Sequence, residues 1–165
     1  MKEPQTWTHK ALVKRISSWL KGTKRFTVVF SELSTQAGET PDVIGWQGRA
    51  YSWLIEVKVS RADFLSDKHK RFRRAEESGM GDRRYFCAPR GMLTANEIPD
   101  GWGLLEVDEH VHITREATYK EANKGNECVM MMSMLRRLEI ATAVYVVQEA
   151  PEQEGHNEAN RQGDI

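Results

Sequence analysis

Cysteine and long apolar runs are scarce in this sequence, and their scarcity excludes several classes of protein. Only Cys87 and Cys128 occur among the 165 residues, without a Cys-x-x-Cys or Cys/His ligand pattern, so we expect two free, partly buried thiols and no zinc site. No apolar run approaches the roughly 20 residues of a membrane span, and the first ten residues lack the apolar core of a secretory signal. A reducing cytoplasm without a membrane partner is therefore the expected setting.

A net charge is also lacking, because 24 Lys and Arg balance 24 Asp and Glu. The charges are nevertheless segregated, since residues 1–90 contain 18 basic against 10 acidic residues and residues 91–165 contain 6 against 14. A basic half suits a polyanion, although the balanced total is unlike a protein that coats DNA nonspecifically. An ordinary solvated surface is the alternative interpretation.

The length suits one domain over residues 1–148, followed by a disordered acidic tail over residues 149–165. Hydrophobic periodicity and turn residues predict the elements of the domain. The expected helices span residues 9–21, 62–78 and 126–147, with a short helical insertion at 92–97, and the expected strands span residues 26–30, 42–46, 50–59, 83–88, 103–107 and 111–114. This order predicts an α/β fold with a central mixed β-sheet flanked by helices.

The apolar residues of the first and last helices predict their buried sides. The stripe on the first helix contains Leu12, Val13, Ile16, Trp19 and Leu20, and the buried side of the last helix is expected to contain Met130, Met131, Met134, Leu135, Leu138 and Ile140.

The most informative stretch is residues 41–60, PDVIGWQGRAYSWLIEVKVS, in which two charges interrupt an apolar strand. Successive strand side chains alternate between faces, so Glu56 and Lys58 share the face opposite to Ile55 and Val57. We interpret the face of Ile55, Val57 and Val59 as the core. The charges on the other face then require an explanation, because a strand surface ion pair would contribute only about 0–1 kcal/mol.

A turn at residues 46–49 offers an explanation for the charges on this face. The turn should fold the preceding strand back and bring Asp42 beside Glu56. Two carboxylates and the Lys58 ammonium would then meet at one patch. Carboxylate oxygens of this kind suit a magnesium ion that keeps most of its waters.

At these residues the sequence resembles the PD-(D/E)XK phosphodiesterase superfamily, whose signature matches Pro41, Asp42, Glu56 and Lys58 in order and spacing. The resemblance implies a restriction-endonuclease-like core and hydrolysis of phosphodiester bonds.

The following residues are similar to MmcB-like DNA-repair nucleases. The continuation SRADFLSDKHK at residues 60–70 matches that family's S-R-x-D-F-x-x-D motif, and residues 83–109 are similar to its later strands. The resemblance covers about residues 25–115 and departs after Asp67, where His69 and Lys70 stand in place of an expected aromatic residue.

The resemblance also implies roles for individual residues. Asp42 and Glu56 would hold one or two Mg²⁺ or Mn²⁺ ions, with the carbonyl of Val57 and the carboxylate of Glu32 as further ligands. Lys58 would orient the attacking water and balance charge in the transition state. Glu32 could equally be an ordinary exposed glutamate at the end of a strand.

A basic segment follows the candidate active strand directly. The residues expected to contact DNA phosphates are Arg61, Lys68, Lys70, Arg71, Arg73 and Arg74. A solvated basic helix is the alternative. Basic residues of the first helix and its end, from Lys14 to Arg25, could also touch phosphate.

Histidines receive no catalytic role from the sequence. We interpret His9 as solvated, and the group of Asp108, His110 and His112 as a solvent-facing turn, because no partner acid stands at a known metal-ligand spacing.

These observations predict a metal-dependent DNA nuclease that acts in DNA repair, recombination or the processing of phage or host DNA. Two alternatives stay open, namely a nuclease-like protein that binds DNA or a protein partner without cutting, and a structural protein whose motif is accidental. A homodimer that cuts both strands also stays open.

Overall fold

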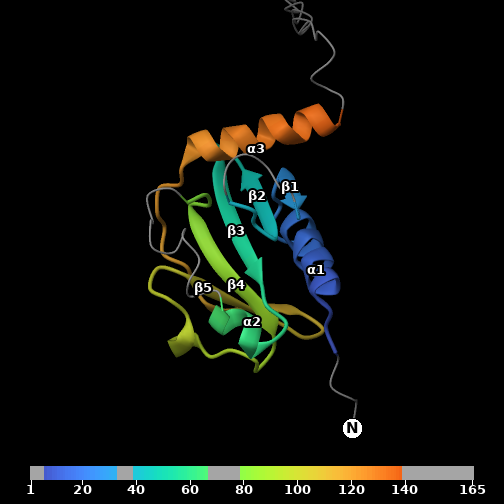
Figure 1. Ribbon diagram of the computed structural model, residues 1–165, viewed down its shortest axis with the longest axis vertical. Coiled ribbons are helices and arrows are strands. Elements are labelled where there is room, and N and C mark those ends of the chain that lie inside the picture. The colour runs from blue at the N-terminus through green and yellow to red at the C-terminus, as the bar shows by residue number, and fades with distance from the viewer. Residues whose placement is uncertain (1–5, 33–38, 67–78, 139–165) are drawn as a thin grey trace, which may run out of the picture.

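The computed structural model describes residues 6–32, 39–66 and 79–138. In this part of the chain the strands form one six-stranded sheet in the order β1-β2-β3-β4-β5-β6 (Figure 1). The elements are α1 (His9–Gly22), β1 (Val28–Ser31), β2 (Val43–Gln47), β3 (Tyr51–Val57), α2 (Arg61–Ser66), β4 (Arg83–Pro89), the 3₁₀ turn η4 (Ala95–Glu97), β5 (Gly103–Val107), β6 (Val111–Arg115) and α3 (Lys124–Arg137).

The sheet is mixed. β1, β2 and β3 pair antiparallel, β3 pairs parallel with β4 and β4 with β5, and β6 pairs antiparallel with β5. The prediction of a mixed sheet flanked by helices is therefore confirmed. The predicted strand boundaries hold within two residues at most ends, and β5 matches its predicted range.

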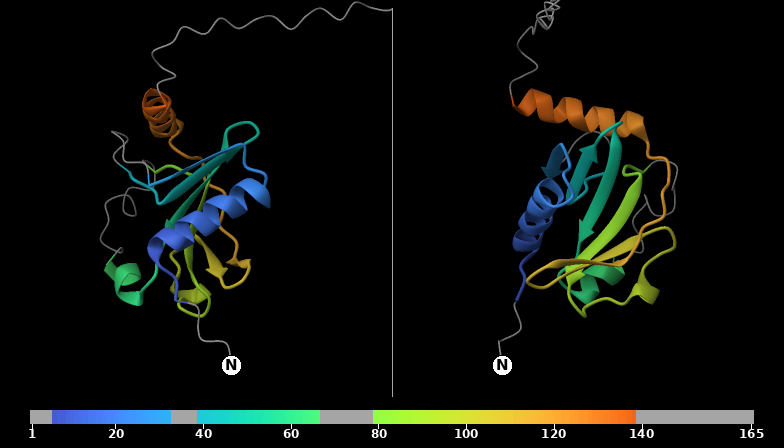
Figure 2. Two further views of the ribbon diagram at one scale, coloured as in Figure 1. Left: turned by 90° about the vertical axis from the view of Figure 1, so that its right-hand side faces the viewer. Right: turned by 180° about the vertical axis from the view of Figure 1, so that it is seen from behind.

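α1 forms as predicted. The Thr8 side chain accepts a hydrogen bond from the backbone N–H of Ala11 at 3.2 Å, which satisfies one of the donors at the helix start. All five residues of its predicted apolar stripe are buried. They pack with Trp53, Ile55 and Val57 on one face of the sheet, and the right-hand panel of Figure 2 shows α1 lying along β1.

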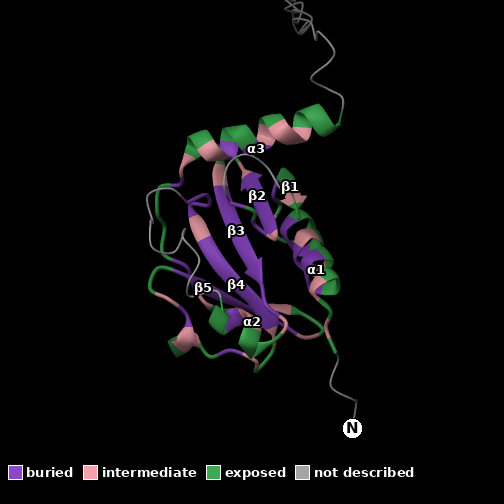
Figure 3. Cartoon of the chain, in the orientation of Figure 1, coloured by how far each residue is buried: buried purple, intermediate pink, exposed green. Residues whose placement is uncertain are grey.

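The second face of the sheet is also core, whereas the sequence identified only the face of Ile55, Val57 and Val59 as core. Leu54 is fully buried and packs with Phe64 of α2 and Phe86 of β4. In Figure 3 the central strands are buried along most of their length. The reason is the parallel pairing of β3 with β4, since parallel strands occur where both faces are covered.

The turn between β2 and β3 fixes the register of the hairpin. Arg49 and Ala50 both adopt φ of 58°, the left-handed conformation that tight hairpin turns require. β3 ends at Val57, two residues before its predicted end, although the N–H of Lys58 still donates to the carbonyl of Cys87 at 2.8 Å.

The prediction for α3 is wrong in part. Met130 is buried and Met131 and Met134 are half-buried, but Leu135 and Leu138 are 43% and 59% exposed. α3 crosses the end of the sheet, and its buried residues, Glu127 and Met130, lie in its first half (Figure 1). The second half therefore has less of the sheet to pack against.

Some of the predicted segments lie partly or wholly outside the described residues. The helix predicted at 62–78 is described only as α2, and residues 67–78 lie outside the described part, as do residues 139–165 with the predicted acidic tail and Ile140. Both cysteines are free, but Cys128 is exposed rather than partly buried. None of the described helices has the length and apolar character needed to cross a membrane.

Candidate active site

Three candidate carboxylates stand in one row across the sheet. Ser31 pairs with Val43, and Val43 pairs with Ile55. One residue further along this register, Glu32 lies opposite Asp42 and Asp42 lies opposite Glu56. The backbone N–H of Glu32 donates to the carbonyl of Asp42 at 2.9 Å, which continues the pairing. We call Glu32, Asp42 and Glu56 the acid row.

Asp42 is held by two donors from different elements. Its Oδ2 accepts a hydrogen bond from the N–H of Val57 at 2.7 Å, and its Oδ1 lies 3.2 Å from Nε2 of His9. The side chain is 22% exposed, so the carboxylate remains accessible. The predicted ligand Val57 is buried beside Asp42 and contributes its N–H to that carboxylate.

His9 belongs to this site, which the sequence interpretation missed. Its Nδ1 also lies 3.7 Å from Oε1 of Glu32, so the ring connects two members of the acid row. α1 runs antiparallel to β1, and its first residue therefore lies at the end of the strand where Glu32 stands. Helical spacing puts position 9 on the same face as Leu12, Ile16 and Leu20, but it does not indicate which end of the sheet that face meets.

Glu56 and Lys58 differ from the other candidates because both are buried, with residue exposures of 7% and 3%. A buried ammonium needs a partner, since moving an unpaired charge out of water is costly. Nζ of Lys58 lies 3.5 Å from Oδ1 of Asp63 in α2. Asp63, a residue of the S-R-x-D-F-x-x-D motif, thus contributes to the position of the lysine.

The start of α2 explains why Asp63 reaches Lys58. The Ser60 hydroxyl accepts a hydrogen bond from the N–H of Asp63 at 3.2 Å, and Phe64 packs into the core beneath the helix. The short connection from β3 to α2 therefore keeps Asp63 near the end of the active strand.

The guanidinium of Arg61 is already bound by groups of the protein itself. Its Nη1 donates to the carbonyl of Met92 at 3.0 Å and to Oε2 of Glu97 at 3.2 Å, and its Nη2 pairs with Oε1 of Glu97. Arg61 in turn lowers the pKa of Glu97 to about 2, with hydrogen bonds from Thr94 adding to the effect. The other predicted phosphate contacts, Lys68, Lys70, Arg71, Arg73 and Arg74, lie outside the described residues.

The acid row offers oxygen ligands of the kind that magnesium prefers. Among the described residues no three His, Cys, Asp or Glu side chains are grouped as a metal site. Magnesium, however, usually binds through one or two carboxylates and keeps waters or substrate phosphates as its other ligands. Asp42 and Glu56 stand opposite each other in the backbone register of β2 and β3, and their carboxylates are donors of this kind.

The turn of Asp108, His110 and His112 faces the protein's own cations. The N–H of His110 donates to Asp108, and Nη1 of Arg90 and Nε2 of His112 lie 2.6 Å and 3.0 Å from its carboxylate. These partners hold the pKa of Asp108 well below its usual range, and the hydrogen bond from the His110 N–H has the largest effect.

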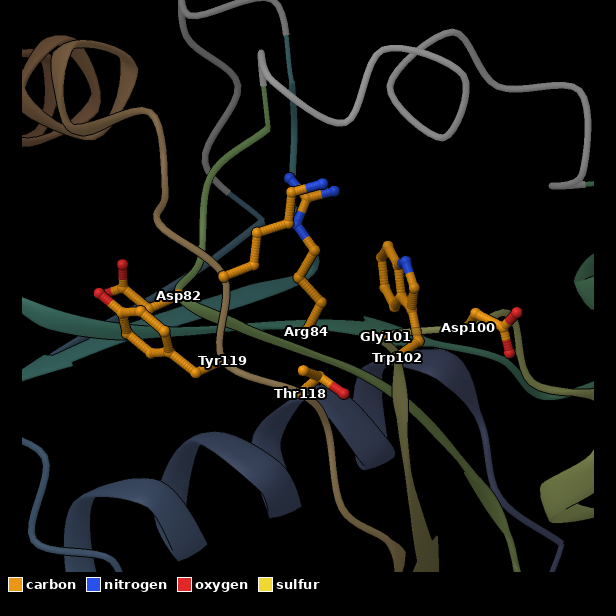
Figure 4. Close-up of a pocket in the computed structure, with 8 residues that line it drawn as sticks. Asp82, Arg84, Asp100, Gly101, Trp102, Thr118 and Tyr119 are labelled. Atoms are coloured by element: carbon orange, nitrogen blue, oxygen red, sulfur yellow. The ribbon is translucent and has the colours of Figure 1, made fainter.

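A cavity of about 390 Å³ lies away from the acid row, at the start of β4 and β5. Figure 4 shows Arg84 beside Trp102 in its wall, with the guanidinium carbon 5.4 Å from the ring centroid. Trp102 also stacks on Phe86 at 4.7 Å, so this wall belongs to the core. The acid row, at the other end of β3, is the better candidate because it contains the motif residues.

Comparisons with known proteins place the chain in a family. The solved structure of the SPO1766 protein of unknown function from Silicibacter pomeroyi matches with a TM-score of 0.62 and 25% identity, over 94% of this chain and 98% of that chain. No curated protein sequence matches. The family model described as DNA repair protein MmcB-like matches residues 3–146, which is most of the sequence. The chain belongs to the MmcB-like family of DNA repair proteins.

Proposed function

We propose that this protein is a metal-dependent nuclease of the PD-(D/E)XK superfamily that hydrolyses phosphodiester bonds of DNA during repair. The observation that carries the proposal is the meeting of Asp42 and Glu56 in register, with the buried Lys58 two residues beyond Glu56. Membership of a DNA repair family supports DNA as the substrate.

Asp42 and Glu56 would hold Mg²⁺ or Mn²⁺, with the carbonyl of Val57 and the carboxylate of Glu32 as additional ligands. When bound, the ion supplies a Lewis acid for the phosphoryl oxygen and lowers the pKa of bound water. The protein's own contribution is to fix the carboxylates, which the Val57 N–H and His9 do for Asp42.

Lys58 would place a positive charge beside the reacting phosphate, where it orients the attacking water and stabilises developing negative charge. Asp63 keeps the ammonium near the end of β3. Lys58 differs from an ordinary solvent-exposed lysine, because the cost of burying its charge has to be compensated by partners.

The proposal is tested by incubating the protein with circular single-stranded, duplex and branched DNA in Mg²⁺, Mn²⁺ or chelator. We expect cleavage that requires the metal and falls at least about 100-fold in Asp42→Asn, Glu56→Gln and Lys58→Ala, the scale expected for loss of an electrostatic catalytic group. Asp100→Asn and Lys120→Ala are matched controls on exposed residues outside the acid row and should keep wild-type cleavage. Cleavage that persists in both Asp42→Asn and Lys58→Ala would contradict the assignment.

A second candidate is a DNA-binding protein without nuclease activity. It is favoured by the contacts of Asp42, whose two carboxylate oxygens already have His9 and Val57 as partners. DNA binding without cleavage in any of the metals would support this candidate over the first.

A further inference from the structure

α1 and the segment that follows it carry positive charge alone. Residues 4–31 contain six Lys and Arg and no Asp or Glu. An ordinary solvated helix face usually carries both signs, which pair along the helix. The absence of acids is therefore a feature that needs an explanation.

Seven of the described lysines and arginines elsewhere in the chain lie close to carboxylates. Within 4 Å of a carboxylate oxygen lie Lys58, Arg61, Arg83, Arg84, Arg90, Arg115 and Lys124. None of the six cations from Lys10 to Arg25 forms such a pair with the residues that the structure describes. Within the described part of the chain, no carboxylate neutralises their charge.

Three of these cations lie on one line. At about 100° per residue, Lys10, Lys14 and Lys21 fall within about 40° of one another on α1, away from its buried stripe. At 1.5 Å per residue they are separated along the helix by roughly 6 Å and roughly 10 Å. All three are exposed, and Nζ of Lys21 donates to the backbone carbonyl of Thr27. We call them the lysine stripe.

An open groove of about 510 Å³ lies beside the lysine stripe. It is lined by Ser17, Ser18, Lys21 and Gly22 of α1 and by Val29 and Ser31 of β1. Hydroxyl groups and lysines are the side chains that commonly bind phosphate oxygens without reading the bases. Lys21 belongs to both the groove and the lysine stripe, so the two surfaces adjoin at this residue.

This surface leads to the candidate active site. β1 runs from the groove residue Val29 through Ser31 to Glu32 of the acid row, and α1 begins at His9, which contacts Asp42 and Glu32. The right-hand panel of Figure 2 shows α1 alongside β1. A strand of nucleic acid lying along α1 would thus approach the acid row.

We propose that the lysine stripe and the α1–β1 groove bind the phosphate backbone of DNA and guide it to the acid row. The inference rests on the proposed function for its choice of DNA as partner, but it does not require cleavage. It adds a binding surface to the basic segment at residues 61–74.

The test is a triple variant, Lys10→Gln, Lys14→Gln and Lys21→Gln, compared with Arg49→Gln, Lys120→Gln and Arg136→Gln, which removes the same charge from exposed positions elsewhere. Binding of labelled single-stranded and duplex DNA is measured by fluorescence anisotropy from low to high salt, with chelator or Ca²⁺ so that binding is separated from cleavage. Thermal unfolding confirms that both triple variants fold.

Loss of three phosphate contacts should reduce the slope of log K against log salt by about 2 for single-stranded DNA and about 3 for duplex DNA. The control triple should keep the wild-type slope. Equal slopes in all three proteins would overturn the inference about the lysine stripe and leave the proposed function standing. No DNA binding by the wild type would overturn it together with the proposed function. Stripe-dependent binding without cleavage in Mg²⁺ or Mn²⁺ would support the surface and reject the nuclease.

Discussion

At the scale of single residues, the position of Asp42 depends on donors from two elements. The Val57 N–H comes from the neighbouring strand, and the histidine comes from the start of α1. The first donor follows from the hairpin register, which the sequence predicted. The second follows from the packing of α1 on the sheet, and helical spacing alone does not say which strand end the helix will reach.

His9→Ala should weaken Mn²⁺ binding about two- to fivefold, because Asp42 and Glu32 lose a partly exposed contact of about 0.5–1 kcal/mol. Titration calorimetry with Mn²⁺ measures this without relying on activity. His9→Gln should restore most of the affinity, since its amide can donate to Asp42. Tighter Mn²⁺ binding in His9→Ala would show instead that the histidine competes with the metal.

At the scale of elements, one buried carboxylate of α3 bonds to several elements of the sheet. Glu127 accepts hydrogen bonds from the Trp46 indole at 2.7 Å, the Ser52 hydroxyl at 2.6 Å and the Gly81 N–H at 2.9 Å. Lys124 completes the network, at 3.2 Å from Glu127 and 2.6 Å from Asp82. The sequence predicted methionines and leucines as the contact surface and missed this glutamate, because a buried carboxylate has no periodic signature.

Glu127→Ala should therefore lower the free energy of unfolding by about 3 kcal/mol or more, because it leaves buried donors without their acceptor. Urea unfolding followed by tryptophan fluorescence measures the change. Glu121→Ala, an exposed glutamate just before α3, is the matched control and should change stability by less than about 0.5 kcal/mol. A similar small change in both variants would show that α3 is held by its apolar contacts.

At the scale of the whole molecule, the two ends of the sheet carry different groups of polar residues. The carboxyl end of β3 carries the acid row and Lys58, and its other end, at Ser52, carries the network that holds α3. Ser52 and Glu56 are four positions apart on β3, or roughly 13 Å. Changes in the α3 network should therefore act on stability more than on the candidate active site.

Acid should destabilise the protein through carboxylates that are held ionised. The pKa of Glu97 is lowered to about 2, chiefly by Arg61, and the partners of Asp108 lower its pKa as well. Burial alone would raise the pKa of Asp82, but hydrogen bonds from Lys124, Ser52 and Ala122 outweigh it and lower the value. Because these values are lower in the folded state, the stabilisation is present above the unfolded pKa of about 4 and is lost as the pH falls toward about 2.

Unfolding free energies measured by urea titration from pH 6 to about pH 2 should fall over this window. Glu97→Gln and Arg61→Gln should each make the fall less steep, since either substitution removes the pair that lowers the pKa of Glu97. An unchanged slope in both variants would show that this pair does not contribute to the acid transition.

The sequence by itself determined the strands, the α/β class and the hairpin register that sets Asp42 opposite Glu56, because strand alternation and a short turn are local properties. The assignment of a second buried face, the exposure of Leu135 and the partners of Lys58 and Arg61 were decided only by the tertiary structure. His9 and Glu127 likewise meet the sheet through the packing of α1 and α3. Such contacts depend on where each helix docks on the sheet. The docking position minimises the free energy of the whole chain, so it cannot be predicted from any one segment.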